Sequence, residues 1–245
     1  MKPIPKSQTE LAPLLVFGAH PDDIEFGCGG VVALETKRGR AAHFVICSRG
    51  ESATSGTPKQ RTAEAKNAAA LLGATLEWLE LDGDAHLELK ASHTIELAKI
   101  IRRVRPGMVL ASTLVENQHP DHWRLGKLVR DATRLARYGG VTELRRQPPH
   151  SIGQLFFYAL TTESEPRDIS PLLIDVSAPD VIAAWTNAMN AHVSQAATRD
   201  YANLQLMRAR LNGQRAGVEY AVALFPNDAP VFDSLAPLAC GARRF

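Results

Sequence analysis

The sequence contains little of what marks secreted or membrane-spanning proteins. Its three cysteines, Cys28, Cys47 and Cys240, are odd in number and form no C-x-x-C pair, so they indicate no disulfide framework. No apolar run approaches the length of a membrane span, which is about 18 residues, and the first residues lack the apolar core of a secretory signal. We therefore expect a cytoplasmic protein with reduced thiols and no membrane insertion.

An excess of charge of one sign is also missing. The 28 lysines and arginines nearly balance the 26 aspartates and glutamates, and both signs are mixed along the chain, with a net charge of +2. Without a basic block, no nucleic-acid partner is expected. The 245 residues are 45% hydrophobic and 22% charged, which suits one domain over residues 1–245 with a well-buried core.

Short apolar runs alternate with helical patterns along the chain. The runs span residues 14–19, 43–47, 76–81, 108–111, 155–159 and 172–176, and the helical patterns span residues 57–73, 92–105, 121–138, 179–195 and 197–212. Thr57, Pro58 and Gln60 supply the N-cap, the first-turn proline and the N3 glutamine of one helix. This alternation predicts an α/β fold of the Rossmann-like type, with a mostly parallel sheet flanked by helices.

The tripeptide His-Pro-Asp occurs twice, each time just after a predicted strand. The first copy lies in A-H-P-D-D at residues 19–23, and the second lies in H-P-D-H at residues 119–122. The carboxyl ends of parallel strands meet at one edge of a sheet, where ligands bind, so we expect the two segments to meet there. Together they offer six polar candidates: His20, Asp22, Asp23, His119, Asp121 and His122.

This set exceeds what one zinc ion needs. A catalytic zinc ion takes three protein ligands, often two histidines and one carboxylate, and keeps one position open. His20 and Asp23 can bind one metal from the first segment, and a ligand from the second completes the set. Hydrolysis of an amide also needs a base and an acid, roles that suit Asp22 and His119, while Asp121 could hold His119 in its working tautomer.

These motifs resemble those of the PIG-L or LmbE-like deacetylase family, whose signature is an A-H-P-D-D loop, a glycine pair and a later H-P-D-H segment. The resemblance covers most of the chain, through Gly50-Glu51, Gly56-Thr57-Pro58, Arg61, Glu64, Leu72-Gly73, residues 192–195 and residues 217–225. One departure is Ala53, where the family often has a second glycine. That difference concerns loop shape, and the metal motifs are intact.

The resemblance implies one zinc ion per chain and an assignment of roles at the site. The implied zinc ligands are His20, Asp23 and His122. The family's general base corresponds to Asp22, the histidine that stabilises or protonates the tetrahedral intermediate to His119, and the carboxylate behind it to Asp121. The implied fold is the Rossmann-like domain already predicted.

Two further residues match positions that bind substrate in the family. Arg61 could clamp a sugar hydroxyl, a phosphate or a carboxylate, although an arginine in the first turn of a helix is also common on surfaces. Asp84 matches a carboxylate that binds sugar hydroxyls, although it could equally be a turn residue. The resemblance thus implies removal of an acyl group, expected to be acetyl, from an N-acetylglucosamine-type sugar or glycoside by an enzyme that could self-associate.

Two other classes of protein are alternatives to a deacetylase. A strand followed by Gly27, Gly29 and Gly30 is similar to a dinucleotide-binding fingerprint, but Val32 stands where G-x-G-x-x-G requires glycine. A non-catalytic carbohydrate-binding protein could use zinc for folding alone, but such sites are usually closed and rich in cysteine. An open three-ligand site with an unused base and acid favours an enzyme.

Overall fold

A mixed sheet lies at the centre of the computed structural model, which describes residues 11–116, 119–196, 199–236 and 241. Seven strands of the described residues form it in the order β3-β2-β1-β4-β5-β7-β6. Their bounds are β1 Leu14–Gly18, β2 Ala42–Ile46, β3 Ala74–Trp78, β4 Met108–Ser112, β5 Gln154–Tyr158, β6 Leu172–Asp175 and β7 Ala221–Pro226. The predicted α/β fold with a mostly parallel sheet is confirmed.

The strand order reverses between β1 and β4. Strand β1 pairs in parallel with β2 on one side and with β4 on the other, and β4 pairs in parallel with β5. The chain therefore winds outwards from β1 to β3 and then returns to place β4 beside β1. Ligands bind at such a switch point in open α/β sheets, and the two His-Pro-Asp segments follow β1 and β4.

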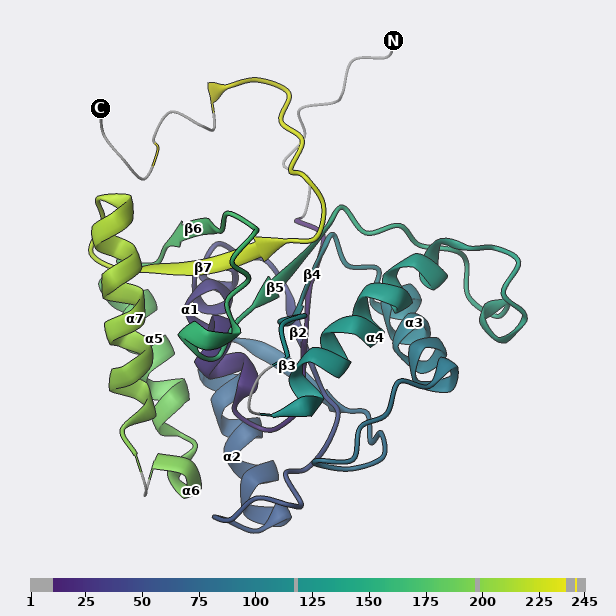
Figure 1. Ribbon diagram of the computed structural model, residues 1–245, viewed down its shortest axis with the longest axis horizontal. Coiled ribbons are helices and arrows are strands. Elements are labelled where there is room, and N and C mark those ends of the chain that lie inside the picture. Colours follow the sequence, from purple (N-terminus) through teal and green to yellow (C-terminus); the bar gives the residue numbers. More distant parts are fainter. Residues whose placement is uncertain (1–10, 117–118, 197–198, 237–240, 242–245) are drawn as a thin grey trace.

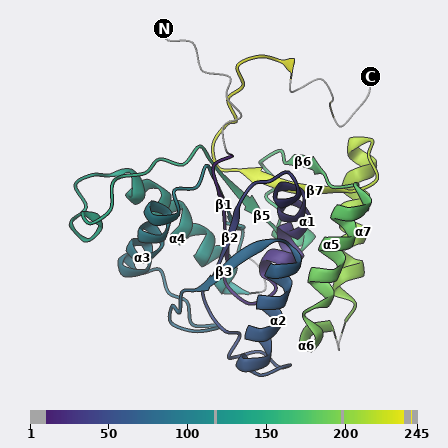
Figure 2. The same cartoon turned by 180° about the vertical axis from the view of Figure 1, so that it is seen from behind.

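Helices cover both faces of the sheet, as Figures 1 and 2 show. Helices α3 and α4 lie on one face, and α1, α2, α5 and α7 lie on the other. The helix bounds are α1 Asp23–Lys37, α2 Pro58–Leu71, α3 Ala91–Val104, α4 Pro120–Arg137, α5 Pro179–Asn190, α6 Val193–Ala196 and α7 Tyr201–Ala216. All five residues of β1 are buried, because this strand is covered on both faces.

Local sequence signals explain several helix boundaries. Thr57 caps α2 by accepting a hydrogen bond from the Gln60 backbone N at 3.2 Å, and Pro58 occupies the first turn, as predicted. The sequence therefore determines the start of α2 without help from distant residues.

None of the described helices combines the length and apolar character that crossing a membrane requires.

Other boundaries differ from the prediction. The pattern over residues 179–195 contains a break between α5 and α6, where His192 is fully buried against Glu25 of α1. The pattern over residues 197–212 corresponds to α7, which extends to Ala216, but residues 197–198 lie outside the described residues, as does Cys240. Strand β7 was not predicted, and it pairs antiparallel with both β5 and β6.

Candidate active site

The first His-Pro-Asp segment forms a tight loop at the carboxyl end of β1. Asp22, the residue before α1, has φ 103°, a left-handed conformation that is unfavourable for any residue except glycine. The loop is held by Asp23, whose Oδ2 accepts hydrogen bonds from the backbone N of Ala19 at 2.9 Å and of His20 at 3.0 Å. This conformation brings three functional side chains together at the switch point.

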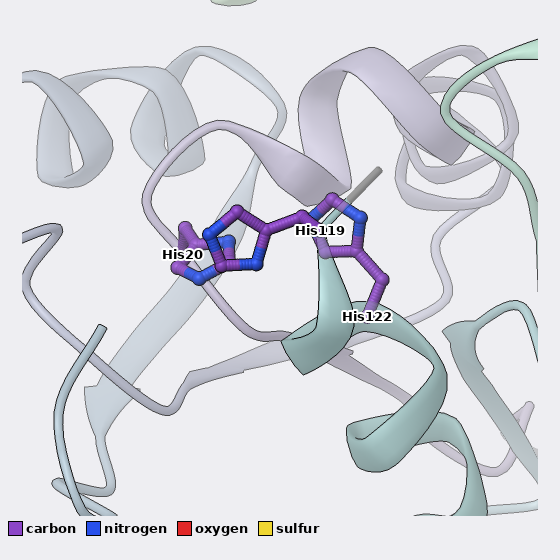
Figure 3. Close-up of side chains that lie close together, drawn as sticks. All are labelled: His20, His119 and His122. Carbon is purple, nitrogen blue, oxygen red and sulfur yellow. The ribbon is translucent and has the colours of Figure 1, made fainter. Parts of the chain in front are cut away.

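His20, Asp23 and His122 form one group of donor atoms. Asp23 Oδ2 lies 3.5 Å from His20 Nδ1, and Asp23 Oδ1 lies 3.2 Å from His122 Nε2. Two ligands of one tetrahedral zinc ion, each about 2.0–2.1 Å from it, are separated by about 3.4 Å, and each of these two contacts is close to that value. The contacts are made by different oxygens of Asp23. Figure 3 shows the rings of His20 and His122 close together with that of His119.

A second group of donor atoms lies on the other side of His20. Its Nε2 is 3.1 Å from Asp84 Oδ1 and 3.2 Å from Asp121 Oδ2, and His119 Nε2 is 3.4 Å from the same Asp84 oxygen. Donor atoms within 4.8 Å of one another occur in two overlapping sets of the described residues: His20, His119 and His122; and His20, Asp84, His119 and Asp121. The cluster as a whole therefore has the donors that a metal ion needs.

Asp84 and Asp121 have different neighbours from those expected at the sequence level. Asp84, predicted to bind substrate, is 5% exposed, contacts both His20 and His119, and accepts a hydrogen bond from the Ser52 backbone N at 3.2 Å. The Asp121 carboxylate, predicted to orient His119, contacts His20 and accepts a bond from the Ala85 backbone N at 2.8 Å, while the Asp121 backbone N donates to His119 Nδ1 at 3.4 Å. The carboxylate in contact with His119 is thus Asp84, which a long loop after β3 brings into the cluster.

The charges of the cluster favour a cation. Burial opposes protonation of His20, but Asp23, Asp121 and Asp84 together raise its pKa well above the ordinary value. Burial also disfavours ionised Asp23, yet His122 and His20 hold its pKa well below the usual range. The carboxylates that stabilise a proton on His20 would also attract a divalent cation, because both carry positive charge.

Arg61 lies beneath Asp22 and is almost fully buried, at 4% exposure. Its Nη2 donates hydrogen bonds to the Pro21 carbonyl at 2.8 Å and to Asp22 Oδ2 at 3.2 Å. The guanidinium packs against Gly50, whose φ is +72° and where a Cβ would overlap Arg61 Nη1. These contacts fix the position of Asp22, so Arg61 is linked to the predicted base as well as to the cavity.

Asp22 is largely enclosed, with 14% of its side chain exposed, and it lies beside a second carboxylate; both features affect its ionisation. Burial raises the pKa of Asp22 to about 6, and Asp23 adds to the increase, whereas His192, Arg61 and His20 oppose it. A carboxyl group with its pKa near neutrality is suited to accept and release protons under physiological conditions.

A cavity of about 510 Å³ opens directly above these residues. This volume lies within the range of small-molecule sites, roughly 300–1,000 Å³. The cluster and Asp22 line it together with residues from the loop after β2, the segment after β5 and the start of α7, including Ser52, Thr54, Leu160, Arg199, Tyr201 and Leu204. All the metal and catalytic residues predicted from the sequence therefore lie at or directly beneath one cavity.

Comparison with known proteins places this arrangement in a family. Residues 15–133, which contain both His-Pro-Asp segments, match the family model described as PIG-L: GlcNAc-PI de-N-acetylase. The chain belongs to the PIG-L family. A solved structure of the conserved protein TT1542 from Thermus thermophilus is 29% identical, with a TM-score of 0.78 over 91% of this chain and 97% of that one. The predicted family and fold are thus confirmed.

The named relatives within this comparison carry two different activities. A 4-oxalmesaconate hydratase from Pseudomonas putida is 34% identical over 138 residues, which is 51% of this chain and 53% of the hydratase. A diacetylchitobiose deacetylase from Thermococcus kodakarensis is 28% identical over 197 residues, which is 74% of this chain and 69% of the deacetylase. The match to the hydratase therefore spans about half of its length. These relatives support an enzyme and leave deacetylation and hydration as alternatives.

In this member of the PIG-L family, the glycines after the first motif serve packing. A Cβ at Gly27 would overlap the ring of Tyr158, and Cβ atoms at Gly29 and Gly30 would lie 2.7 and 2.9 Å from Trp185. The glycines let α1 approach these two buried aromatic residues closely. This contact accounts for the glycine-rich segment without a phosphate group, which removes the main argument for a dinucleotide site.

A buried pair near this PIG-L site was not predicted. His192 Nε2 lies 3.5 Å from Glu25 Oε2, and both side chains are fully enclosed. Burial lowers the pKa of His192, but Glu25 outweighs this and raises it. The pair connects the start of α1, which carries the first motif, to the turn before α6. Residues so far apart in sequence offered no local pattern that could have revealed the contact.

Proposed function

We propose that this protein is a zinc-dependent N-deacetylase that releases acetate from the amide nitrogen of an N-acetylglucosamine-type sugar or glycoside. The observation that carries the proposal is the cluster of histidines and carboxylates below the cavity, in which Asp23 lies 3.5 Å from His20 Nδ1 and 3.2 Å from His122 Nε2. Each distance is close to the separation of two ligands on one zinc ion. We favour this donor set because His20 Nε2 then remains free to donate to a carboxylate, as metal-bound histidines usually do.

Zn²⁺ held by His20, Asp23 and His122 would supply Lewis-acid chemistry, polarising an acyl oxygen and making a neighbouring water molecule more acidic. Asp22 then accepts a proton as the water oxygen bonds to the acyl carbon. His119, whose side chain is 35% exposed at the cavity, donates a proton to the nitrogen as the C–N bond breaks. The products are acetate and a free amine.

The remaining residues support this division of roles. Arg61 contacts Asp22 at 3.2 Å, and Asp84 contacts His119 at 3.4 Å, so the proposed base and the proposed acid each have a charged partner that can orient them. Asp121 contacts His20 at 3.2 Å and would orient that proposed ligand. In the proposed deacetylase, the base Asp22, the acid His119 and the metal ligand His20 thus each contact a charged side chain that can orient them.

A screen of N-acetylated amino sugars and glycosides tests the proposal. Release of primary amine and of acetate should appear in equal amounts, and zinc measured on the same sample should approach one ion per chain. A chelator should abolish the activity, and added zinc should restore it. Zinc binding without acetate release from any substrate would favour the non-catalytic carbohydrate-binding alternative.

Hydration of an unsaturated polycarboxylate is a second candidate, because the P. putida relative that is 34% identical is named as a hydratase. The same site could activate water for addition to a carbon–carbon double bond. The two reactions have different products: hydration consumes a conjugated chromophore and releases no amine. Loss of ultraviolet absorbance with unsaturated polycarboxylates, together with inactivity on every N-acetyl sugar, would replace deacetylation by hydration.

Three minor expectations belong to the same proposal. The partner is a small molecule and not a nucleic acid, and a cytoplasmic location follows from the reduced thiols expected for Cys28 and Cys47, which are both free and buried. Self-association is expected only by analogy with sugar-processing enzymes. Light scattering of the purified protein would measure its oligomeric state.

A further inference from the structure

One cationic side chain at the mouth of the cavity has no part in the proposed chemistry. Arg199 lines the cavity, is exposed and lies two residues before the start of α7. Its guanidinium carbon is 5.9 Å from the ring centroid of Tyr201, which in turn lies 5.6 Å from the ring of Phe26. Within the described part of the chain, no carboxylate lies close enough to form an ion pair with it.

The charges that face the cavity leave Arg199 uncompensated. Asp22 is paired with Arg61, and Asp23 and Asp84 belong to the cluster that would hold a divalent cation. The nearby carboxylate of Asp200 is turned towards the helix, where it accepts a hydrogen bond from the Asn203 backbone N at 2.9 Å. Among the described residues that line the cavity, none neutralises the positive charge of Arg199.

Outside the metal cluster and the Asp22–Arg61 pair, the other cavity-lining residues that the structure describes carry no carboxylate. Ser52 and Thr54 present hydroxyl groups, and Leu160 and Leu204 present apolar surface. A guanidinium binds carboxylates and phosphates through paired hydrogen bonds, and a cleft with low-dielectric walls strengthens its field. Tyr201 lies within 5.9 Å of the Arg199 guanidinium carbon and within 5.6 Å of the Phe26 ring, so a cation–π contact joins Arg199 to the wall of the cavity.

We propose that the natural substrate carries an anionic group, a carboxylate or a phosphate, remote from its reacting acyl group, and that Arg199 binds this anion. The inference rests on the proposed function, because it takes the metal cluster as the reacting end of the cavity. It adds the substrate class: an acidic amino-sugar derivative in place of a neutral one. Arg199 acts as a specificity-determining residue and takes no part in bond cleavage.

A matched pair of substrates tests this assignment. N-acetylglucosamine 1-phosphate and methyl N-acetylglucosaminide share the acyl group and differ in charge, and N-acetylmuramic acid supplies a carboxylate. We expect wild-type kcat/KM to be at least about tenfold higher for an anionic substrate than for the neutral one, mainly through KM. The ratio should fall by at least about tenfold in Arg199→Gln and by less in Arg199→Lys, which keeps the charge but loses the planar fork.

Arg210→Gln is the control variant. Arg210 is an exposed arginine within α7, and its guanidinium carbon is 6.0 Å from the ring centroid of Tyr220, but it does not line the cavity. Its substitution should leave the anionic-to-neutral ratio unchanged. A ratio that is equal in wild type, Arg199→Gln and Arg210→Gln would overturn the proposal. A preference for phosphate over carboxylate, or the reverse, identifies the kind of anion.

Failure of the proposed function gives a different result. If the wild type releases amine from none of these compounds and from no member of the wider screen, deacetylation is wrong, and titration calorimetry with the same compounds then tests the anion site alone. Tighter binding of an anionic compound to wild type than to Arg199→Gln, by about tenfold or more, would support the site. Equal binding to both proteins, or no binding of any anion, would reject it.

Discussion

Arg61 Nη2 lies 3.2 Å from Asp22 Oδ2, so an almost fully buried arginine contacts the residue proposed as general base. An arginine that only clamped substrate would act mainly through KM. The observed pair adds a second role, because Asp22 has an unfavourable backbone conformation and needs neighbours that hold it. The relationship therefore changes what a substitution of Arg61 should do.

We predict that Arg61→Ala lowers kcat by about 10- to 100-fold, in addition to any rise in KM, because displacement of a reacting group by as little as about 1 Å can have an effect of that size. Steady-state kinetics separate the two parameters. Arg49→Ala is the control, since Arg49 pairs with the exposed Glu80 and does not contact Asp22. A variant with wild-type kcat and a raised KM would restore Arg61 to substrate binding alone.

Asp22→Asn should keep bound zinc near the wild-type level and reduce the rate by about 10²-fold or more, the usual scale of positioned acid–base catalysis. The amide retains the size of the side chain but cannot accept the proton. Asp23→Asn, one residue away, should instead lose zinc. Metal analysis of both variants decides the assignment: loss of zinc from Asp22→Asn with retention in Asp23→Asn would exchange the two roles.

The pH dependence of the rate follows from the same carboxyl group. Asp22 can act as a base only when ionised, and burial raises its pKa to about 6, so kcat/KM should decline as the pH falls through this region. A bound divalent cation would move the decline to lower pH. Because Arg61 lowers the pKa of Asp22, Arg61→Ala should move it to higher pH. A pH–rate profile that moves in the opposite direction would contradict this assignment.

His20→Ala and His122→Ala should each lose most of the bound zinc together with activity, because two remaining ligands form an incomplete site. Zinc content after dialysis and the rate measured at added zinc provide the test. His43→Ala is a suitable control, since His43 lies on β2 and hydrogen-bonds Thr75 at 2.7 Å. Nearly one zinc ion per chain in either of the first two variants would remove that histidine from the ligand set.

Asp84→Asn and His119→Ala distinguish the two groups of donors. If the metal is bound by His20, Asp23 and His122, both variants should retain zinc at saturating concentration and lose about 10- to 100-fold of activity, as expected for residues that orient or serve the reacting groups. If the metal is bound on the Asp84 side of His20, zinc content should fall sharply. Zinc titrations of the two proteins beside wild type would show which group is used.

The sequence by itself determined the α/β fold, the start of α2 and the position of the two His-Pro-Asp segments at the ends of strands, because these depend on apolar runs and on caps such as Thr57 that act over a few residues. The tertiary structure alone decided that Asp84 contacts His119, that Arg61 contacts Asp22, that Arg199 faces the cavity and that β7 completes the sheet. Such contacts join segments separated by long crossovers, and no local periodicity or capping pattern encodes where those crossovers end.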